Sequence, residues 1–193
     1  MKKIPTLFKR YFEGHKIIGI TPEITDARCE KAFKEGAATV KIDGSCCAII
    51  NGELYKRYDC KKGKTPPKGA IACCKPDPVT GHWPHWVKVD SSNPADKWFW
   101  EAYMSTPPSH FQKGEPTDGT YEAIGPHFQG NPYGLEVDVL VQHGILGSLV
   151  DRDFDSVKQW LTDHEEEGLV FWLDGEPVCK IKRTDFGLPW PVK

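Results

Sequence analysis

Two turn dipeptides, each placed between runs rich in apolar residues, constrain the fold of this chain most strongly. Asn51-Gly52 separates SCCAII from ELYKRYD, and Asp174-Gly175 separates GLVFWL from PVCKIK. Asn-Gly and Asp-Gly readily adopt positive φ at two consecutive residues, which the common two-residue hairpin turn requires. The sequence therefore predicts two β-hairpins and, with them, antiparallel sheets.

Further extended segments and three helices complete the predicted fold. ATVKIDG, TYEAIG and EVDVLV are typical of strands. Strands outnumber helices and mostly follow one another, and 193 residues suit one domain, so we expect an α+β domain of antiparallel sheets with flanking helices. The helices are expected from Thr25 or Asp26 to about Glu35, from Asn93-Pro94 to Met104, and from about Asp153 to Asp163.

The remaining regions are expected to be irregular or to fill the core. Residues 60–95 and 105–119 are rich in Pro and Gly, which favours irregular structure. Trp98, Trp100 and Tyr103 lie in the second expected helix and are predicted to be core residues, because large aromatic side chains contribute much buried area.

The net charge of −2 argues against a surface built for non-specific nucleic-acid binding, but the charge is unevenly distributed. Residues 56–75 hold seven Lys or Arg against a single acidic residue, Asp59. Such a window is either a solvated loop or a local contact for a phosphate backbone. Trp83 and Trp86, just beyond it, are the aromatic residues best placed to contact RNA.

Cysteine usage and hydropathy indicate a soluble cytoplasmic protein. Seven cysteines, four of them in the vicinal pairs Cys46-Cys47 and Cys73-Cys74, are read as reduced thiols. No run approaches the roughly 20 apolar residues of a membrane span. A zinc site remains the alternative, although no C-x-x-C pair is present; it would be built from Cys60, Cys73, Cys74, His82 and His85.

Charged residues inside predicted strands mark the candidate site. Lys41 lies in an apolar run with Asp43 two positions later, on the same strand face, and Lys180 and Lys182 share a face of the last strand. Half-buried ammonium groups are costly unless an anion meets them, although an edge strand with a solvent-facing side would also carry lysines. Together with the carboxylates Glu122 and Glu167, the three lysines form a candidate site for a polyphosphate and Mg²⁺.

The order of these elements resembles the motif series of the covalent nucleotidyltransferases, the superfamily of nucleic-acid ligases and RNA capping enzymes. The series is Lys41-Ile42-Asp43-Gly44, Arg57, Glu122, Glu167-Gly168-Leu169-Val170 and Lys180-Ile181-Lys182. KIDGSCCAI, GHWPHWV, YEAIGPHFQGNPYGL, VQHG and KIKRTDFGLPWP resemble the small ATP-dependent RNA ligases of vertebrates, some viruses and microbes.

The resemblance implies an ATP-grasp-like nucleotidyltransferase fold. A single adenylyltransferase or RNA ligase domain would cover residues 1–193, without a C-terminal OB-fold, since only residues 183–193 follow the last motif. The implied partners are ATP, Mg²⁺ or Mn²⁺, and RNA with 5′-phosphate and 3′-hydroxyl ends. No obligate protein partner is expected.

The resemblance also implies a role for each motif residue. Lys41 would attack the α-phosphate of ATP, release pyrophosphate and hold AMP, which then passes to the RNA 5′-phosphate and is displaced by the 3′-hydroxyl. Lys180 and Lys182 would hold the α-phosphate. The other implied nucleotide-binding residues are Asp43 and Gly44 beside Lys41, Arg57 and Glu122 at the ribose, and Glu167, with Glu122, at the divalent metal.

The physical chemistry of lysine agrees with these roles. Only a neutral amine attacks phosphorus, and neutralising a lysine of pKa about 10.4 at pH 7 costs roughly 4 to 5 kcal/mol. Neighbouring cations would lower this cost at Lys41 and would also stabilise the phosphate under attack.

The sequence leaves open an alternative function, the residue that stacks on adenine and the roles of four histidines. A nucleotide-binding or RNA-end-binding relative that does not seal ends, or an RNA guanylyltransferase, is the alternative function. Related proteins often stack an aromatic residue on adenine after the third motif, whereas VDVLVQHG offers aliphatic residues and a histidine. No role is assigned to His82, His85, His127 or His143.

Overall fold

The computed structural model describes residues 3–14, 16–111 and 114–192, and the chain forms two compact units. Unit 1 contains the continuous segment 43–143, and unit 2 contains residues 3–42 together with the chain from Gly144 onward. Each unit has its own sheet and its own buried core. That one adenylyltransferase domain spans residues 1–193 stays a prediction.

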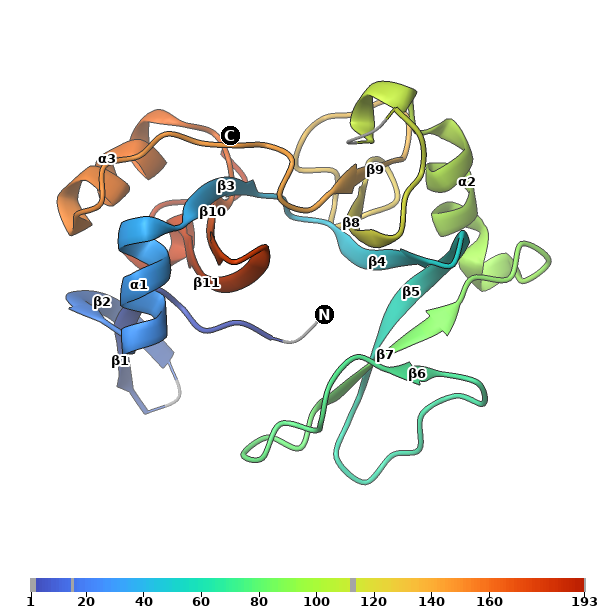
Figure 1. The fold of residues 1–193 in the computed structure, drawn as a ribbon, viewed down its shortest axis with the longest axis horizontal. Coiled ribbons are helices and arrows are strands. Elements are labelled where there is room, and N and C mark those ends of the chain that lie inside the picture. The colour runs from blue at the N-terminus through green and yellow to red at the C-terminus, as the bar shows by residue number, and fades with distance from the viewer. Residues whose placement is uncertain (1–2, 15, 112–113, 193) are drawn as a thin grey trace. The chain divides into compact units, whose positions relative to one another are not determined.

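Unit 2 is built around a three-stranded antiparallel sheet in the order β11-β10-β3. The helix α1 packs against β10 and β11 (Figure 1). Its core is formed by buried residues that include Leu7, Phe8, Phe33 and Phe171. The elements of unit 2 are β1 (Phe8–Glu13), β2 (Lys16–Ile24), α1 (Ala27–Glu35), β3 (Ala37–Lys41), α3 (Phe154–Asp163), β10 (Gly168–Leu173), β11 (Glu176–Lys182) and the 3-10 helix η3 (Arg183–Phe186).

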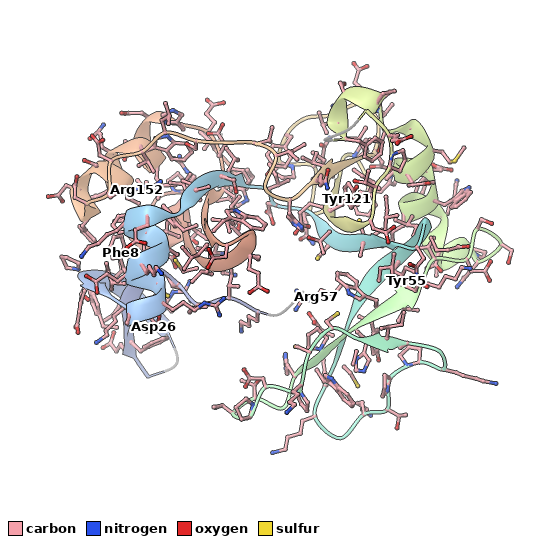
Figure 2. All side chains as sticks on the ribbon, in the orientation of Figure 1. Phe8, Asp26, Tyr55, Arg57, Tyr121 and Arg152 are labelled. Carbon is pink, nitrogen blue, oxygen red and sulfur yellow. The ribbon has the colours of Figure 1, made fainter. Side chains whose placement is uncertain are left out.

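Unit 1 is built on a six-stranded antiparallel sheet in the order β6-β7-β5-β4-β8-β9. Its core gathers around Tyr121, which is fully buried and lies among the side chains of this unit in Figure 2. The elements are β4 (Ser45–Ile50), β5 (Glu53–Cys60), β6 (Ile71–Ala72), β7 (Trp83–Lys88), the 3-10 helix η1 (Pro94–Asp96), α2 (Lys97–Ser105), the 3-10 helix η2 (Pro108–His110), β8 (Gly119–Ile124) and β9 (Val139–Gln142).

The structure confirms the α+β class and both predicted hairpins. Asn51 and Gly52 have φ of 53° and 75°, and Asp174 and Gly175 have φ of 52° and 77°, so both turns have the predicted positive-φ geometry. The three helices also lie where they were expected. Asp26, at the start of α1 in Figure 2, resolves the choice of cap because its Oδ1 accepts a hydrogen bond from the Cys29 amide at 2.8 Å.

Several local expectations were wrong. β1 and β2 form a hairpin that was not expected, and β6 and β7 lie in the region 60–95, which was expected to be irregular. ATVKIDG is not one strand, because β3 ends at Lys41 and Asp43 begins unit 1, so the shared strand face proposed for these two residues does not exist. Trp100 is 38% exposed and is not a core residue.

No helix in the described part of the chain is long and apolar enough to cross a membrane.

Candidate active site

The lysines predicted to act on phosphate lie on one sheet in unit 2. The register of the sheet places Lys41 of β3 and Lys182 of β11 on either side of Gly168, the first residue of the central strand. Lys180 lies two residues earlier on β11, opposite Val170, and therefore on the same face as Lys182. Cys179 and Ile181 point the other way and are fully buried, as predicted from the alternation of the strand.

Gly168 has a steric reason for its place between the two lysines. A Cβ atom at this position would lie 2.1 Å from the carbonyl oxygen of Ile181, which is far below any normal contact. The glycine therefore lets β10 and β11 approach closely where both lysine side chains begin.

Glu167, immediately before β10, connects the two lysines. Its Oε2 accepts a hydrogen bond from Lys41 Nζ, and its Oε1 lies 3.4 Å from Lys182 Nζ. The Glu167 side chain is only 6% exposed, whereas Glu165 is exposed and Glu166 is half-buried. A carboxylate buried this deeply needs cationic partners, because an unpaired buried charge is costly.

Lys180 lies close to other cationic side chains. Burial, followed by the charges of Lys41 and Lys182, lowers its pKa from 10.5 to about 8, although Glu167 acts in the opposite direction. Its backbone is fixed by the N-terminal segment, since its amide donates to the Pro5 carbonyl at 3.0 Å. An anion bound here would relieve the repulsion among the three ammonium groups.

Arg10 of β1 also contributes to this cationic group, and sequence reasoning missed it. Its charge is among the causes that lower the pKa of Lys180. Its Nε donates to Asp185 Oδ1 at 3.0 Å, and Asp185 in turn accepts from the Lys182 amide at 2.9 Å. The three aromatic residues of FKRYF could have indicated the strand, but nothing in the sequence indicates the partner, which lies 175 residues away.

Unit 1 positions the predicted Glu122 on β8, opposite Cys46 of β4 and Val141 of β9. Its Oε1 lies 3.1 Å from Nε2 of His143, and Nδ1 of His143 lies 2.9 Å from Oγ1 of Thr120. Its Oε2 is buried and has no hydrogen-bond partner among the described residues. His143 was given no role by the sequence, because its partner is set by the pairing of strands rather than by spacing along the chain.

The remaining predicted residues also lie in unit 1. Arg57 on β5 donates from Nε to Asp59 Oδ1 at 2.9 Å. The Asp43 amide donates to the Tyr133 hydroxyl at 2.7 Å. A Cβ atom at Gly44 would lie 2.5 Å from the Ala123 carbonyl oxygen, so the glycine of the motif permits close packing against β8.

Cys46 lies close to both Glu122 and Arg57. Burial, followed by the charge of Glu122, raises the pKa of its thiol to about 12, while the charge of Arg57 acts in the opposite direction. The thiol is therefore neutral at pH 7.

The structure thus brings together Lys41, Glu167, Lys180 and Lys182 in unit 2, and it places Asp43, Gly44, Arg57 and Glu122 in unit 1. A common metal site for Glu122 and Glu167 stays a prediction. Among residues 3–14, 16–111 and 114–192, no group of three or more His, Cys, Asp or Glu side chains is arranged to hold a metal ion, so the zinc alternative has no geometric support. All seven cysteines are free thiols.

In the basic window, residues 56–75, and just beyond it, the lysines suit a contact with nucleic acid better than the tryptophans do. Lys61, Lys62 and Lys64 are exposed, as a phosphate contact requires. Trp86, however, is only 7% exposed, and Trp83 is half-buried and donates from its Nε1 to the Cys74 carbonyl at 2.6 Å. The lysines therefore remain the better candidates for RNA contact.

Comparison with known proteins gives a consistent group of relatives. No protein-family profile matches the chain. It is 27% identical to RNA ligase 1 of Danio rerio over 99% of this chain and 82% of that protein. It is 24% identical to RNA ligase 1 of Pongo abelii and 23% identical to that of Rattus norvegicus, in both cases over 95% of this chain and 77% of the relative. By this similarity along almost its whole length, the chain is a relative of the vertebrate RNA ligase 1 proteins.

Proposed function

We propose that this protein is an ATP-dependent RNA ligase, which joins a 5′-phosphate to a 3′-hydroxyl through an AMP covalently held by Lys41. The contact that carries the proposal is the pairing of Lys41 with the buried Glu167, on the sheet that also presents Lys180 and Lys182. The similarity to proteins named RNA ligase 1 supports RNA as the substrate.

In the first step, the neutral amine of Lys41 attacks the α-phosphorus of ATP. The bond from lysine nitrogen to phosphorus forms, the bond from the α-phosphorus to the bridging oxygen breaks, and pyrophosphate leaves with the electron pair. The proton lost from the amine can pass to Glu167, whose Oε2 already accepts a hydrogen bond from it.

Lys180 and Lys182 serve this step in two ways. Their charges disfavour the ammonium form of Lys41, and they stabilise the negative charge that builds up on the α-phosphate. The lowered pKa of Lys180, caused first by burial and then by its two lysine neighbours, supports a cationic cluster in need of an anion.

Carboxylate oxygens are the ligands that Mg²⁺ prefers, and Glu167, with Glu122, is the proposed ligand for Mg²⁺ or Mn²⁺. The cation would neutralise charge on the triphosphate when bound. In unit 1, Arg57 and Glu122 are the proposed contacts to the ribose, with Asp43 and Gly44 next to the nucleophile in the chain.

Two transfers complete the proposed reaction. A 5′-phosphate oxygen of the RNA attacks the lysyl-bound phosphorus, which frees Lys41 and leaves AMP on the RNA end. The RNA 3′-hydroxyl then attacks the 5′-phosphorus, forms the new phosphodiester and releases AMP.

The test is incubation with ATP or GTP labelled at the α-phosphate, with Mg²⁺, followed by detection of label on the denatured chain. We expect label from ATP and none from GTP, loss of the label in Lys41→Ala, and retention in Lys34→Ala, which changes an exposed lysine of α1. Label from GTP alone would indicate the guanylyltransferase alternative. Wild-type labelling of Lys41→Ala would show that the nucleophile is a different residue.

A further inference from the structure

Glu122 presents one bonded and one unbonded oxygen on the face of the unit 1 sheet that points away from the core. Its neighbours along β8, Tyr121 and Ala123, are fully buried on the opposite face. Oε1 is paired with His143 at 3.1 Å, whereas Oε2 is buried and accepts no hydrogen bond from any described residue. Leaving a buried acceptor without a donor is costly, so this atom indicates the place of a ligand group.

His143 fixes the position of that carboxylate. A carboxylate offers only acceptors, so Nε2 of His143 must carry the hydrogen that faces Glu122. Thr120 holds the other side of the ring, with its Oγ1 at 2.9 Å from Nδ1, and its carbonyl oxygen accepts from the His143 amide at 3.0 Å. The imidazole is therefore anchored at both ring nitrogens and at its backbone, and it occupies Oε1 while Oε2 stays available.

The surroundings of Oε2 favour a neutral hydroxyl donor as the ligand group. Cys46, opposite Glu122 on β4, offers only a weakly polar thiol, and Val141, opposite it on β9, is apolar and buried. A phosphate would be repelled by the carboxylate, and a metal ion, the other ligand proposed for Glu122, would need further ligands beyond Glu122 and His143. A sugar hydroxyl needs one acceptor, which Oε2 supplies.

We propose that His143 is a positioning residue, which holds Glu122 so that its free oxygen accepts a hydrogen bond from a ribose hydroxyl of ATP. The inference rests on the proposed function and adds a residue to which no role was given by sequence. His143 acts through Glu122 and does not itself contact the reacting atoms.

The test compares self-adenylylation by ATP, 2′-deoxy-ATP and 3′-deoxy-ATP in the wild type, His143→Ala and His143→Gln. With ATP, His143→Ala should lower kcat/KM by about 10- to 100-fold, the range for losing one hydrogen bond to a charged group. The deoxy analogue that lowers the wild-type kcat/KM most is the one that lacks the hydroxyl in contact with Glu122. With this analogue, kcat/KM of His143→Ala should be less than about 3-fold below that of the wild type, because the hydrogen bond that His143 supports is already missing. His143→Gln should recover most of the rate with ATP, because its side-chain amide can donate to Glu122.

A matched control is His82→Ala, which removes an exposed histidine of the same unit and should change none of the three rates. Equal losses for ATP and both analogues in His143→Ala would overturn the inference, since a structural role or a metal-ligand role of Glu122 does not depend on the ribose hydroxyls. A Gln variant as impaired as the Ala variant, with an unchanged melting temperature, would also overturn it. A wild type that takes no label from ATP would instead overturn the proposed function, and this inference with it.

Discussion

Glu167 determines the balance of charge in the unit 2 site, because it is the buried carboxylate between Lys41 and Lys182. We expect Glu167→Ala to lower the rate of adenylylation by at least about 100-fold, near 2.7 kcal/mol, since it removes both the partner of Lys41 and the proposed metal ligand. Glu165→Ala and Glu166→Ala should stay within a few fold of wild type. Single-turnover labelling measures all three, and equal losses would mean that the run acts as a diffuse acidic surface.

Lys180 should make the stability of the protein depend on pH in the alkaline range. Its pKa is about 8 in the folded state, lowered by burial and then by Lys41 and Lys182, against the ordinary value of 10.5 in the unfolded chain. Between pH 8 and pH 10.5 the unfolded state binds more protons than the folded state, so the free energy of unfolding rises as the pH rises through this range. This stabilisation is lost as the pH falls through 8.

Lys180→Met should therefore stabilise the protein more at pH 7 than at pH 10, relative to wild type. Denaturant unfolding at the two pH values measures the difference. Lys34→Met, which changes an exposed lysine on α1, should show the same difference from wild type at both. A pH-independent effect of Lys180→Met would contradict the repulsion described for this cluster.

At the scale of elements, Gly168 sets the approach of β10 to β11. Gly168→Ala would place a methyl group 2.1 Å from the Ile181 carbonyl oxygen, and we expect it to destabilise the protein by about 1 to 3 kcal/mol, the cost of overpacking. Gly147→Ala is the control, because nothing lies within 4 Å of the added Cβ and its φ is not positive. Chemical denaturation compares them, and similar losses at both glycines would refute the steric argument.

The elements that the sequence predicted are those defined by local chemistry. Asn51-Gly52 and Asp174-Gly175 fix their turns through the φ angles these residues tolerate, and Asp26 fixes a helix start through a bond to a residue three positions away. β7 was missed because Pro84 lies inside it, and proline normally argues against a strand.

The residues of the candidate site also divide into those that the sequence indicates and those that depend on contacts between distant segments. That Lys41, Lys182 and Glu167 lie close together was expected from their motif order, whereas the partners of Arg10 and His143 were not expected. These partners depend on which strands lie side by side, and β3 and β10 are paired across more than 120 residues of chain. Strand order of this kind leaves no periodic trace in one sequence.

At the scale of the whole molecule, the charge distribution suggests where RNA is held. The chain has a net charge of −2, yet Lys61, Lys62 and Lys64 are exposed together in the window 56–75. Replacing these three lysines by Ala should weaken RNA binding and flatten its dependence on salt by about two to three units of slope, since each phosphate contact contributes roughly 0.7 to 0.9. Self-adenylylation should change little.

The matched control replaces Lys31, Lys34 and Lys158, which are equally exposed but lie in unit 2. Fluorescence titrations of a labelled RNA at several salt concentrations give the slopes. If both triple variants flatten the slope equally, RNA contact is spread over the surface, and an unchanged slope in the first would exclude the basic window.

The described part of unit 1 is continuous in sequence, whereas unit 2 consists of two separate segments. This difference decides the order in which the residues of the unit 2 site are synthesised. The described part of unit 1 is one uninterrupted segment, so all of its strands have been synthesised before translation of the second part of unit 2 begins. Lys41 emerges early, but β10 and β11, which carry Gly168, Lys180 and Lys182, follow more than a hundred residues later. The nucleophile therefore acquires its partners only after more than a hundred further residues have been translated, and chains that stop before Glu167 should be unable to take up AMP.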